Sequence, residues 1–265
     1  MASSIQASTQ GHQLTALRAR IARLERGATW RQKPVASFGV PAIDRYLPGG
    51  GLACGALHEV AGTGPEMEHG AAAALFIAGW LARVRGHVLW VLERADLFAP
   101  ALAGVGLAPH RVVYVEAGSP DAGLLAMEEG LRHPGLAAVV GEVSGKLSLT
   151  ASRRLQLAAG ASGVTGFALR RSRRHDDPIL AEPTAAVTRW RLSALPSPPP
   201  LPESPDVPGL GPAHWRLELV RCRGGEPSSW IVEACDAKGR LRLADDVADR
   251  PAAQTGFGRL RRAAG

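Results

Sequence analysis

A glycine-rich segment near the start of the chain, residues 62–70, has the layout of a loop that binds phosphate. The short stretch 57–60 before it predicts a strand, and residues 71–84 after it predict an apolar helix. Loops of this kind hold phosphate oxygens with backbone N–H groups and with the N-terminus of the following helix. The segment therefore predicts the shape of a nucleotide site, built on Gly62, Gly64 and Gly70.

The side chains that such a loop needs are absent from this segment. A lysine for the terminal phosphates and a serine or threonine for the metal should follow the last glycine, but Ala71 and Ala72 stand there. Glu66 and Glu68 add negative charge to the loop without a nearby cation to offset it. Two interpretations stay open: weak nucleotide binding through the backbone, or a structural relic that only turns the chain.

Glu93 follows the predicted strand His87–Leu92, at the edge where parallel α/β sheets gather their ligands. A glutamate there could act as a general base, but a base without a metal-held phosphate has no substrate. We expect this strand-end carboxylate to pair with an arginine.

Arginines gather where the predicted strand 164–170 ends. The polar segment 170–178 also carries Asp176 and Asp177, which partly offset the positive charge. The arginines could bind DNA phosphates without regard to sequence, or an acidic surface of a partner protein. The alternative is a solvated loop with no binding role. The candidate contact residues are Arg170, Arg171, Arg173 and Arg174.

The composition restricts the class of protein. The chain has 265 residues and a net charge of +7, and only three of its 31 basic residues are lysines. An arginine excess suits contacts to phosphate or carboxylate, and it is equally consistent with a biased composition and solvated side chains. The three cysteines and eight histidines lack the spacing of disulfide or metal sites, so we expect a reducing compartment and no metal. The longest apolar run, residues 71–82, is too short to cross a bilayer, which predicts a soluble cytoplasmic protein without membrane contact.

The N-terminal residues 1–39 are expected to form a flexible region that contains one amphipathic helix. Apolar residues recur at helical spacing between residues 12 and 26, and a linker, residues 30–39, follows. The apolar stripe either packs on its own domain or binds a partner. Its residues are Leu14, Leu17, Ile21 and Leu24.

Strands and helices alternate from residue 40 to residue 196. This order predicts an α/β core in which helices flank a mostly parallel sheet. Trp90 and Tyr114 lie in apolar strands, so we expect both in the core. The predicted strands are 57–60, 87–92, 111–116, 136–143, 164–170 and 187–195, and the predicted helices are 71–84, 97–105, 121–132 and 149–161.

The pattern changes in the last part of the chain. Residues 197–212 include seven prolines, which predicts an irregular connection. Antiparallel strands are expected at 214–222, 229–235 and 239–243, so that residues 197–248 extend the core. Residues 249–265 are expected to form a flexible basic tail.

The order of elements resembles the RecA-like core, in which a glycine-rich approach such as residues 47–52 leads into the strand and phosphate loop. The resemblance places a catalytic glutamate at Glu93, and it implies that Glu93 is a vestigial catalytic candidate here. It places a metal-positioning aspartate after residues 138–140, where Gly141 and Glu142 stand, and a glutamine that senses the terminal phosphate at Arg170. Residues 171–182 then occupy the place of the second DNA-contacting loop.

The loop lysine, the loop serine or threonine, the aspartate and the glutamine are all missing. Their joint loss resembles the ImuA family, the RecA-like accessory proteins of bacterial inducible mutagenesis. Runs at 94–100, 127–132 and 149–157 are similar to that family, and the resemblance covers about residues 47–195. It implies a role in SOS-induced translesion synthesis after DNA damage. The implied partners are an ImuB-type polymerase relative, RecA and an error-prone replicative-type polymerase.

Two functional hypotheses from different classes follow. The first is a non-enzymatic adaptor that binds proteins, with single-stranded DNA as a weak secondary partner and no cofactor. The second is an active RecA-type ATPase that acts on single-stranded DNA through an unorthodox loop. The simultaneous departure of four functional positions favours the adaptor. The oligomeric state stays open.

Overall fold

The computed structural model describes residues 34–64, 66–172, 177–201, 203–204 and 206–244. The predicted helix at 12–26 with its apolar stripe, the tail at 249–265, and Arg173 and Arg174 lie outside the described residues.

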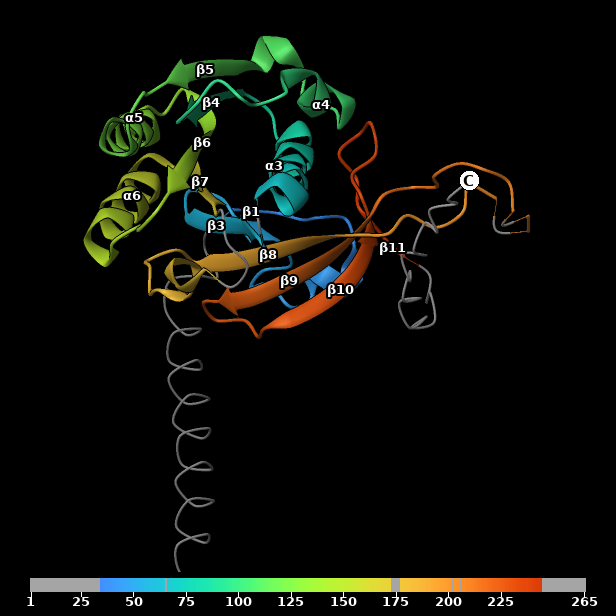
Figure 1. The fold of residues 1–265 in the computed structure, drawn as a ribbon. Coiled ribbons are helices and arrows are strands. Elements are labelled where there is room, and N and C mark those ends of the chain that lie inside the picture. The colour runs from blue at the N-terminus through green and yellow to red at the C-terminus, as the bar shows by residue number, and fades with distance from the viewer. Residues whose placement is uncertain (1–33, 65, 173–176, 202, 205, 245–265) are drawn as a thin grey trace, which may run out of the picture.

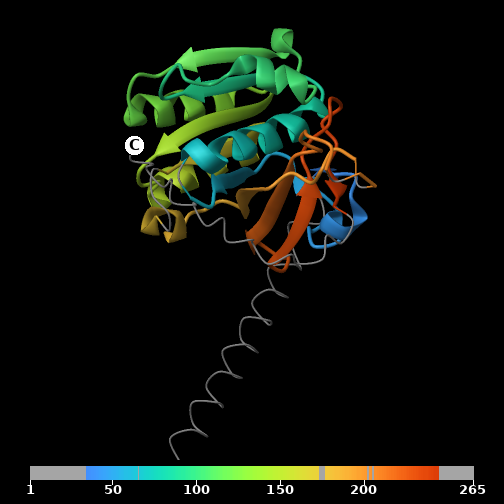
Figure 2. The same ribbon diagram turned by 45° about the vertical axis from the view of Figure 1, so that its right-hand side comes forward.

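A nine-stranded sheet forms the centre of the described chain, in the order β11-β10-β9-β8-β3-β7-β6-β4-β5. The strands from β8 to β5 are parallel to one another, and β9, β10 and β11 continue the sheet in antiparallel pairing. Figure 2 shows β9 and β10 at the end of the sheet opposite β4 and β5. The bounds are β3 Leu57–Gly62, β4 His87–Leu92, β5 Val112–Glu116, β6 Leu136–Ser144, β7 Thr165–Arg171, β8 Thr188–Leu195, β9 His214–Cys222, β10 Ser228–Glu233 and β11 Arg242–Leu243.

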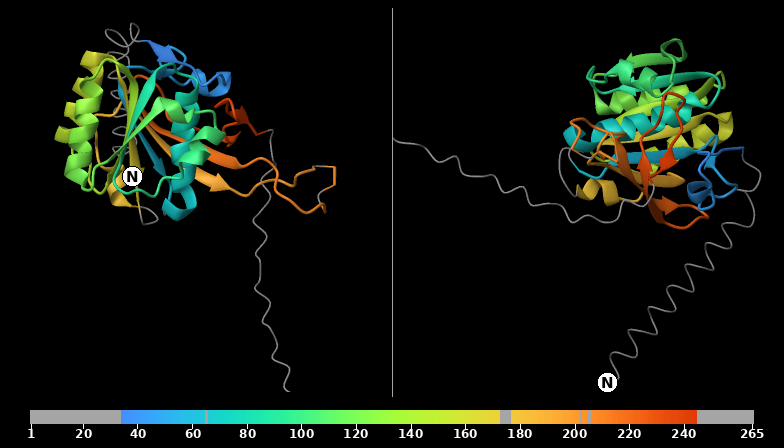
Figure 3. Two further views of the ribbon diagram at one scale, coloured as in Figure 1. Left: turned by 90° about the horizontal axis from the view of Figure 1, so that it is seen from above. Right: turned by 90° about the vertical axis from the view of Figure 1, so that its right-hand side faces the viewer.

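Helices cover both faces of the parallel part. Helices α3 (Glu66–Ala82) and α4 (Ala99–Gly104) lie on one face, and α5 (Pro120–Arg132) and α6 (Leu149–Ser162) lie on the other (Figure 1; Figure 3, left). The core on the α3 side holds the large aromatic side chains, and the core on the α5 and α6 side is mainly aliphatic. The first includes Phe76, Trp90, Phe167 and Trp190, and the second includes Leu57, Met127, Leu131 and Leu155.

Local sequence signals explain where α5 and α6 begin and end. The hydroxyl groups of Ser119 and Ser148 accept hydrogen bonds from backbone N–H groups in the first turn of each helix, which satisfies donors that the helix leaves free. Helix α6 ends at Gly163, whose φ of 83° is in the left-handed region that favours glycine. The short segments η1 (Pro109–Arg111) and η2 (Pro178–Ala181) join larger elements.

Most of the predicted elements are confirmed, and the predicted mostly parallel α/β class is confirmed with them. Strands β4 and β9 have the predicted bounds, and the connection after β8 lacks helix or strand in its described residues. Trp90 is fully buried, but the prediction of a buried Tyr114 is wrong, because β5 is an edge strand and Tyr114 is 38% exposed.

The predicted linker at 30–39 is wrong for its second half. Strand β1 (Val35–Ala36) pairs with β2 (Leu52–Ala53), and Phe38 packs against Phe76 and Trp190. Helix α2 (Pro41–Asp44) follows, and the Asp44 carboxylate accepts the backbone N–H groups of Phe38, Gly39 and Val40. The core therefore begins at least at residue 35, because burial of the Phe38 ring ties this segment to α3.

Candidate functional site at the carboxyl edge of the sheet

The turn between β3 and α3 is much shorter than a phosphate loop. Helix α3 begins at Glu66, so Gly70, Ala71 and Ala72 lie inside the helix rather than at its start. The predicted helix start at residue 71 is therefore wrong by one and a half turns. Glutamate, methionine and alanine form helix readily, and acidic side chains are stabilised in a first turn, which favours the earlier start.

Protein groups pack closely around the turn between β3 and α3. A Cβ placed on Gly62 would be 2.8 Å from Cβ of His69, so the first turn of α3 packs directly on the end of β3. The N–H group of Thr63 donates to the carbonyl of Leu192 at 2.9 Å, and Nδ1 of His69 accepts the N–H group of Ala194 at 3.2 Å. The space that Gly62, Gly64 and Gly70 line is about 20 Å³, enough for a water molecule.

Arg170 is part of a buried charge cluster and is not available to DNA. Its guanidinium is 2.8 Å from the carboxylate of Glu59, which also contacts Arg189 at 3.0 Å and accepts the hydroxyl of Thr184 at 2.8 Å. Glu59 is 1% exposed and Arg170 is 4% exposed. Burial lowers the pKa of Arg170 and Glu59 opposes that change, so the guanidinium remains charged. The prediction of a DNA or partner contact at Arg170 is wrong, because β7 directs this side chain into the molecule.

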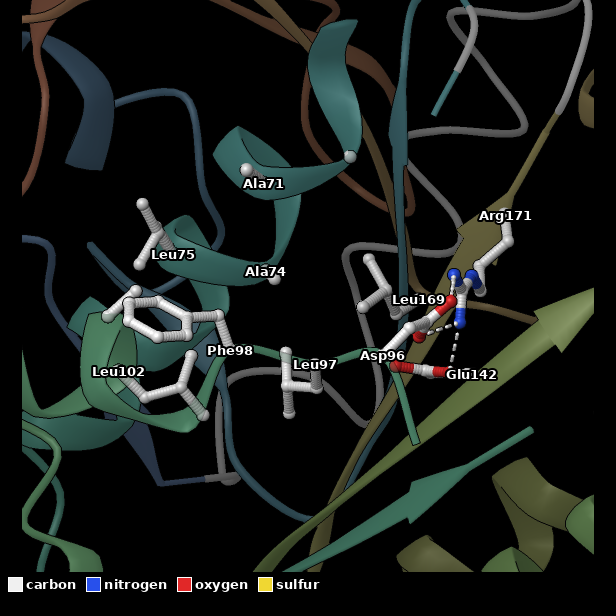
Figure 4. Close-up of a pocket in the computed structure, with 12 residues that line it drawn as sticks. Ala71, Ala74, Leu75, Asp96, Leu97, Phe98, Leu102, Glu142, Leu169 and Arg171 are labelled. Carbon is white, nitrogen blue, oxygen red and sulfur yellow. Dashed lines mark hydrogen bonds and ion pairs between the residues drawn. The ribbon is translucent and has the colours of Figure 1, made fainter. Parts of the chain in front are cut away.

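Arg171 joins two carboxylates from neighbouring elements. Its guanidinium is 2.7 Å from Glu142 on β6 and 2.6 Å from Asp96, which follows β4 (Figure 4). Burial raises the pKa of Glu142, and Arg171 opposes this, whereas the hydrogen bonds from Arg171 lower the pKa of Asp96. The carboxylate at the place of the metal-positioning aspartate is therefore bound to an arginine, and Arg171 lies on β7 rather than in the predicted polar loop.

Glu93 bonds to Ser144 rather than to the predicted arginine. Its carboxylate accepts the N–H group of Ser144 at 2.7 Å and also the Ser144 hydroxyl. Strands β4 and β6 are neighbours, so their carboxyl ends bring these residues together. Arg171, from the next strand, is already bound by Glu142 and Asp96. The expected arginine partner of Glu93 is thus wrong.

An apolar pocket lies beside the Arg171 ion pairs and was missed by the sequence reasoning. It has a volume of about 210 Å³ and lies between α3 and α4. Figure 4 shows its apolar side chains around the Phe98 ring, with Arg171, Asp96 and Glu142 at one end. The available signal was the apolar pair Leu97-Phe98 directly after Asp96, but only the fold brings it to the first turns of α3.

The described residues offer little for metal binding, for nucleophilic cysteine chemistry or for a membrane-spanning helix. No group of three or more histidine, cysteine, aspartate or glutamate side chains in the described ranges could hold a metal ion. Burial raises the pKa of the Cys222 thiol to about 11, so it is protonated at neutral pH and poorly nucleophilic. Over the same ranges, every helix is too short or too polar to cross a bilayer.

Comparison with known proteins supplies the family. The chain is 44% identical over 237 residues to "Protein ImuA" of Caulobacter vibrioides, in each of two strains, and this match covers 85% of the chain and 95% of the relative. This chain belongs to the ImuA family. The predicted ImuA resemblance is confirmed, although no protein-family model matches the chain.

A solved structure shows the fold of this ImuA-family chain independently. The crystal structure of the RadB recombinase superposes with a TM-score of 0.53 at 18% identity, over 79% of this chain and 99% of RadB. This likeness concerns the fold alone, and it confirms the predicted RecA-like architecture.

Proposed function

We propose that this chain is a non-catalytic RecA-like adaptor in mutagenesis induced by DNA damage. In this proposal it acts in the cytoplasm during the SOS response and binds an ImuB-type polymerase relative in translesion synthesis. RecA and an error-prone replicative-type polymerase are further partners. Membership of the ImuA family supports the accessory role, and the geometry of the degenerate nucleotide site supports the absence of catalysis.

The observation that carries the non-catalytic part is the packing of His69 on Gly62. Phosphoryl transfer depends on groups positioned around the phosphates and on cations that stabilise their charge. Here His69, in the first turn of α3, packs on Gly62, and the cavity that the loop glycines line, about 20 Å³, is much smaller than a triphosphate site. Ala72 and Ala73 of α3 are part of the core, so the first turns of this helix are held against the sheet.

The charged side chains around the site support the same proposal. Glu93 and Glu142 hold the positions of a catalytic base and a metal-positioning group. Ser144 bonds the first and Arg171 pairs with the second. Arg170, at the place of the phosphate-sensing glutamine, is paired with Glu59. These internal contacts would have to break before Glu93, Glu142 or Arg170 could act on a nucleotide.

The test is the thermal stability of the purified chain with and without Mg·ATP. A ligand at 100 times its Kd stabilises the folded state by about 2.7 kcal/mol, so millimolar Mg·ATP would raise the melting temperature if it bound with micromolar affinity. We expect an unchanged melting temperature and no hydrolysis above background. ATP turnover that disappears in Glu93→Gln would instead establish the alternative, an active ATPase. A RecA-type ATPase assayed in parallel is the positive control.

Direct DNA contact stays a prediction for Arg173 and Arg174 alone. Arg170 and Arg171 are bound inside the protein, so the cluster is smaller than the sequence indicates. Weak binding through two phosphate contacts would be strongly reduced by salt.

A further inference from the structure

The apolar pocket between α3 and α4 has the size of one large side chain. Its volume of about 210 Å³ is below the ~300–1,000 Å³ that is usual for small-molecule sites. Ala71, Ala74 and Leu75 line it from α3, and Leu97, Phe98 and Leu102 line it from the α4 side (Figure 4). Phe98 is 70% exposed, so an aromatic ring at the mouth of the pocket is left largely open to solvent.

The charged side chains that line one end of the pocket are two carboxylates and one guanidinium, and Arg94, outside the lining, also acts on Asp96. Arg171 offsets one of the two carboxylates that it contacts, Glu142 and Asp96. The hydrogen bonds from Arg171 lower the pKa of Asp96, and the Asp96 side chain is 46% exposed. An apolar group followed by a cation therefore fits this pocket, because opposite charges favour its orientation.

The described chain ends on the same side of the sheet as the pocket. A turn before β11 packs on α3, where a Cβ placed on Gly79 would be 2.3 Å from Sγ of Cys235. The same turn reaches the residues after α4, where a Cβ placed on Gly106 would be 2.8 Å from the carbonyl oxygen of Ala237. From Ala244, the thirteen residues to Phe257 span up to about 45 Å when extended. This is well beyond the length of α3, which is about 26 Å for its 17 residues.

We propose that the C-terminal segment of the same chain, residues 249–265, docks in this pocket with the Phe257 ring inside it. The segment has an aromatic residue between two glycines, followed by the cation Arg259 and then by Arg261 and Arg262. This order matches an apolar pocket with the Asp96 carboxylate at one end: the Phe257 ring stacks near Phe98 and the arginines lie toward Asp96. The proposal is independent of the adaptor function.

A photo-crosslinking experiment on the full chain tests the proposal. Phe257 is replaced by benzoylphenylalanine, and the crosslinked peptides are mapped by mass spectrometry after irradiation. We expect crosslinks within the peptides that contain residues 71–75 and 97–102. A mixture of isotopically heavy and light chains then shows whether each crosslink joins one chain or two. Crosslinks to other regions, or pocket crosslinks only between heavy and light chains, would refute docking within one chain.

Two further variants locate the contact. Ala71 is exposed at the rim of the pocket, so Ala71→Trp should fill the pocket and abolish the crosslink. Asp96→Lys should reduce the yield severalfold by reversing the charge. The matched controls are Ala161→Trp and Asp121→Lys, on exposed positions of α6 and α5, and neither should change the yield. Equal yields in the pocket variants and in their controls would overturn the proposal, provided that circular dichroism shows all four folded.

Discussion

Glu59 is the residue on which the buried polar structure depends. Its single carboxylate contacts Arg170 and Arg189 and accepts a hydrogen bond from Thr184. Burial of charged groups is unfavourable unless each is paired and hydrogen-bonded. The cluster joins β3, β7 and β8 through Glu59, Arg170 and Arg189, so these buried charges hold three neighbouring strands together.

The first residue-scale prediction concerns this cluster. Glu59→Gln keeps the size of the side chain but removes the carboxylate charge that contacts both buried arginines, Arg170 and Arg189. We expect a loss of about 3–5 kcal/mol in the free energy of unfolding, measured with urea. The control is Lys146→Ala, which removes an exposed ion pair with Glu182 and should cost about 0–1 kcal/mol. Equal losses in the two variants would show that the Glu59 cluster adds nothing to stability.

The second residue-scale prediction concerns pH. Burial raises the pKa of Cys222 to about 11, whereas an unfolded cysteine ionises at about 8.5. As pH rises through this interval the unfolded state loses its proton first, so the folded state becomes less stable. At about pH 10 this effect is about 2 kcal/mol for one thiol.

The corresponding measurement is urea unfolding of the native chain and of Cys222→Ala at about pH 7.5 and about pH 10. The native chain should lose more stability between the two conditions than the variant does. An identical loss in both proteins would mean that Cys222 ionises normally in the folded chain.

At the scale of elements, helix α3 contacts three different parts of the molecule along its length. Its first turns pack on the end of β3 through His69, and its middle forms the aromatic core with Phe38 and Trp190. Its C-terminal part receives the turn that precedes β11, where Cys235 and Gly239 lie against Gly79. The antiparallel extension is thus fastened to the parallel core.

We predict that Gly79→Ala loosens this junction. The added methyl group would be 2.3 Å from Sγ and 2.9 Å from Cβ of Cys235, so the turn has to move. Overpacking of this kind costs about 1–3 kcal/mol, which exceeds the gain of about 1 kcal/mol in helix propensity. In Gly104→Ala, where no atom lies within 4 Å of the new methyl group, stability should stay equal or rise. The stability of both variants is measured by thermal unfolding. A Gly79→Ala variant that is more stable than the native chain would contradict the close packing of the turn on α3.

At the scale of the whole molecule, the described residues form a nine-stranded mixed sheet, covered by helices over its parallel part, and a separate two-stranded sheet, β1-β2. Within the N-terminal segment, residues 35–38 belong to the folded core, through β1 and the Phe38 ring. Residues 1–33 precede it, and the predicted partner helix lies there. A truncation experiment must therefore end before the first core residue.

We predict that deletion of residues 1–27 weakens binding to an ImuB-type partner while the remaining chain still melts cooperatively. Deletion of residues 1–39 should lower the melting temperature sharply, because it removes β1 and the buried Phe38. Thermal unfolding and pull-down with the partner measure the two effects. If the shorter deletion also destroys the cooperative melt, the apolar stripe packs on its own core and the predicted interface is wrong.

The sequence by itself determined which segments form the parallel strands and the helices, and their order along the chain. Apolar runs such as Val88–Leu92 are local signals, and burial on both faces of a strand follows directly from them. The absence of lysine and of serine or threonine after Gly70 is also a local fact. The RecA-like class and the ImuA family could therefore be predicted from residues close together in the chain.

Only the tertiary structure decided which charges meet. Arg170 and Glu59 are 111 residues apart in sequence, and neither residue's local pattern identifies the other. A glutamate in the buried strand β3 requires a buried partner. The parallel pairing of β3 with β7 is what brings Arg170 to it. The pocket likewise combines α3 with residues 97–102. Side chains that are distant in sequence come together through strand order and helix packing, so the binding surfaces of this chain follow from its fold.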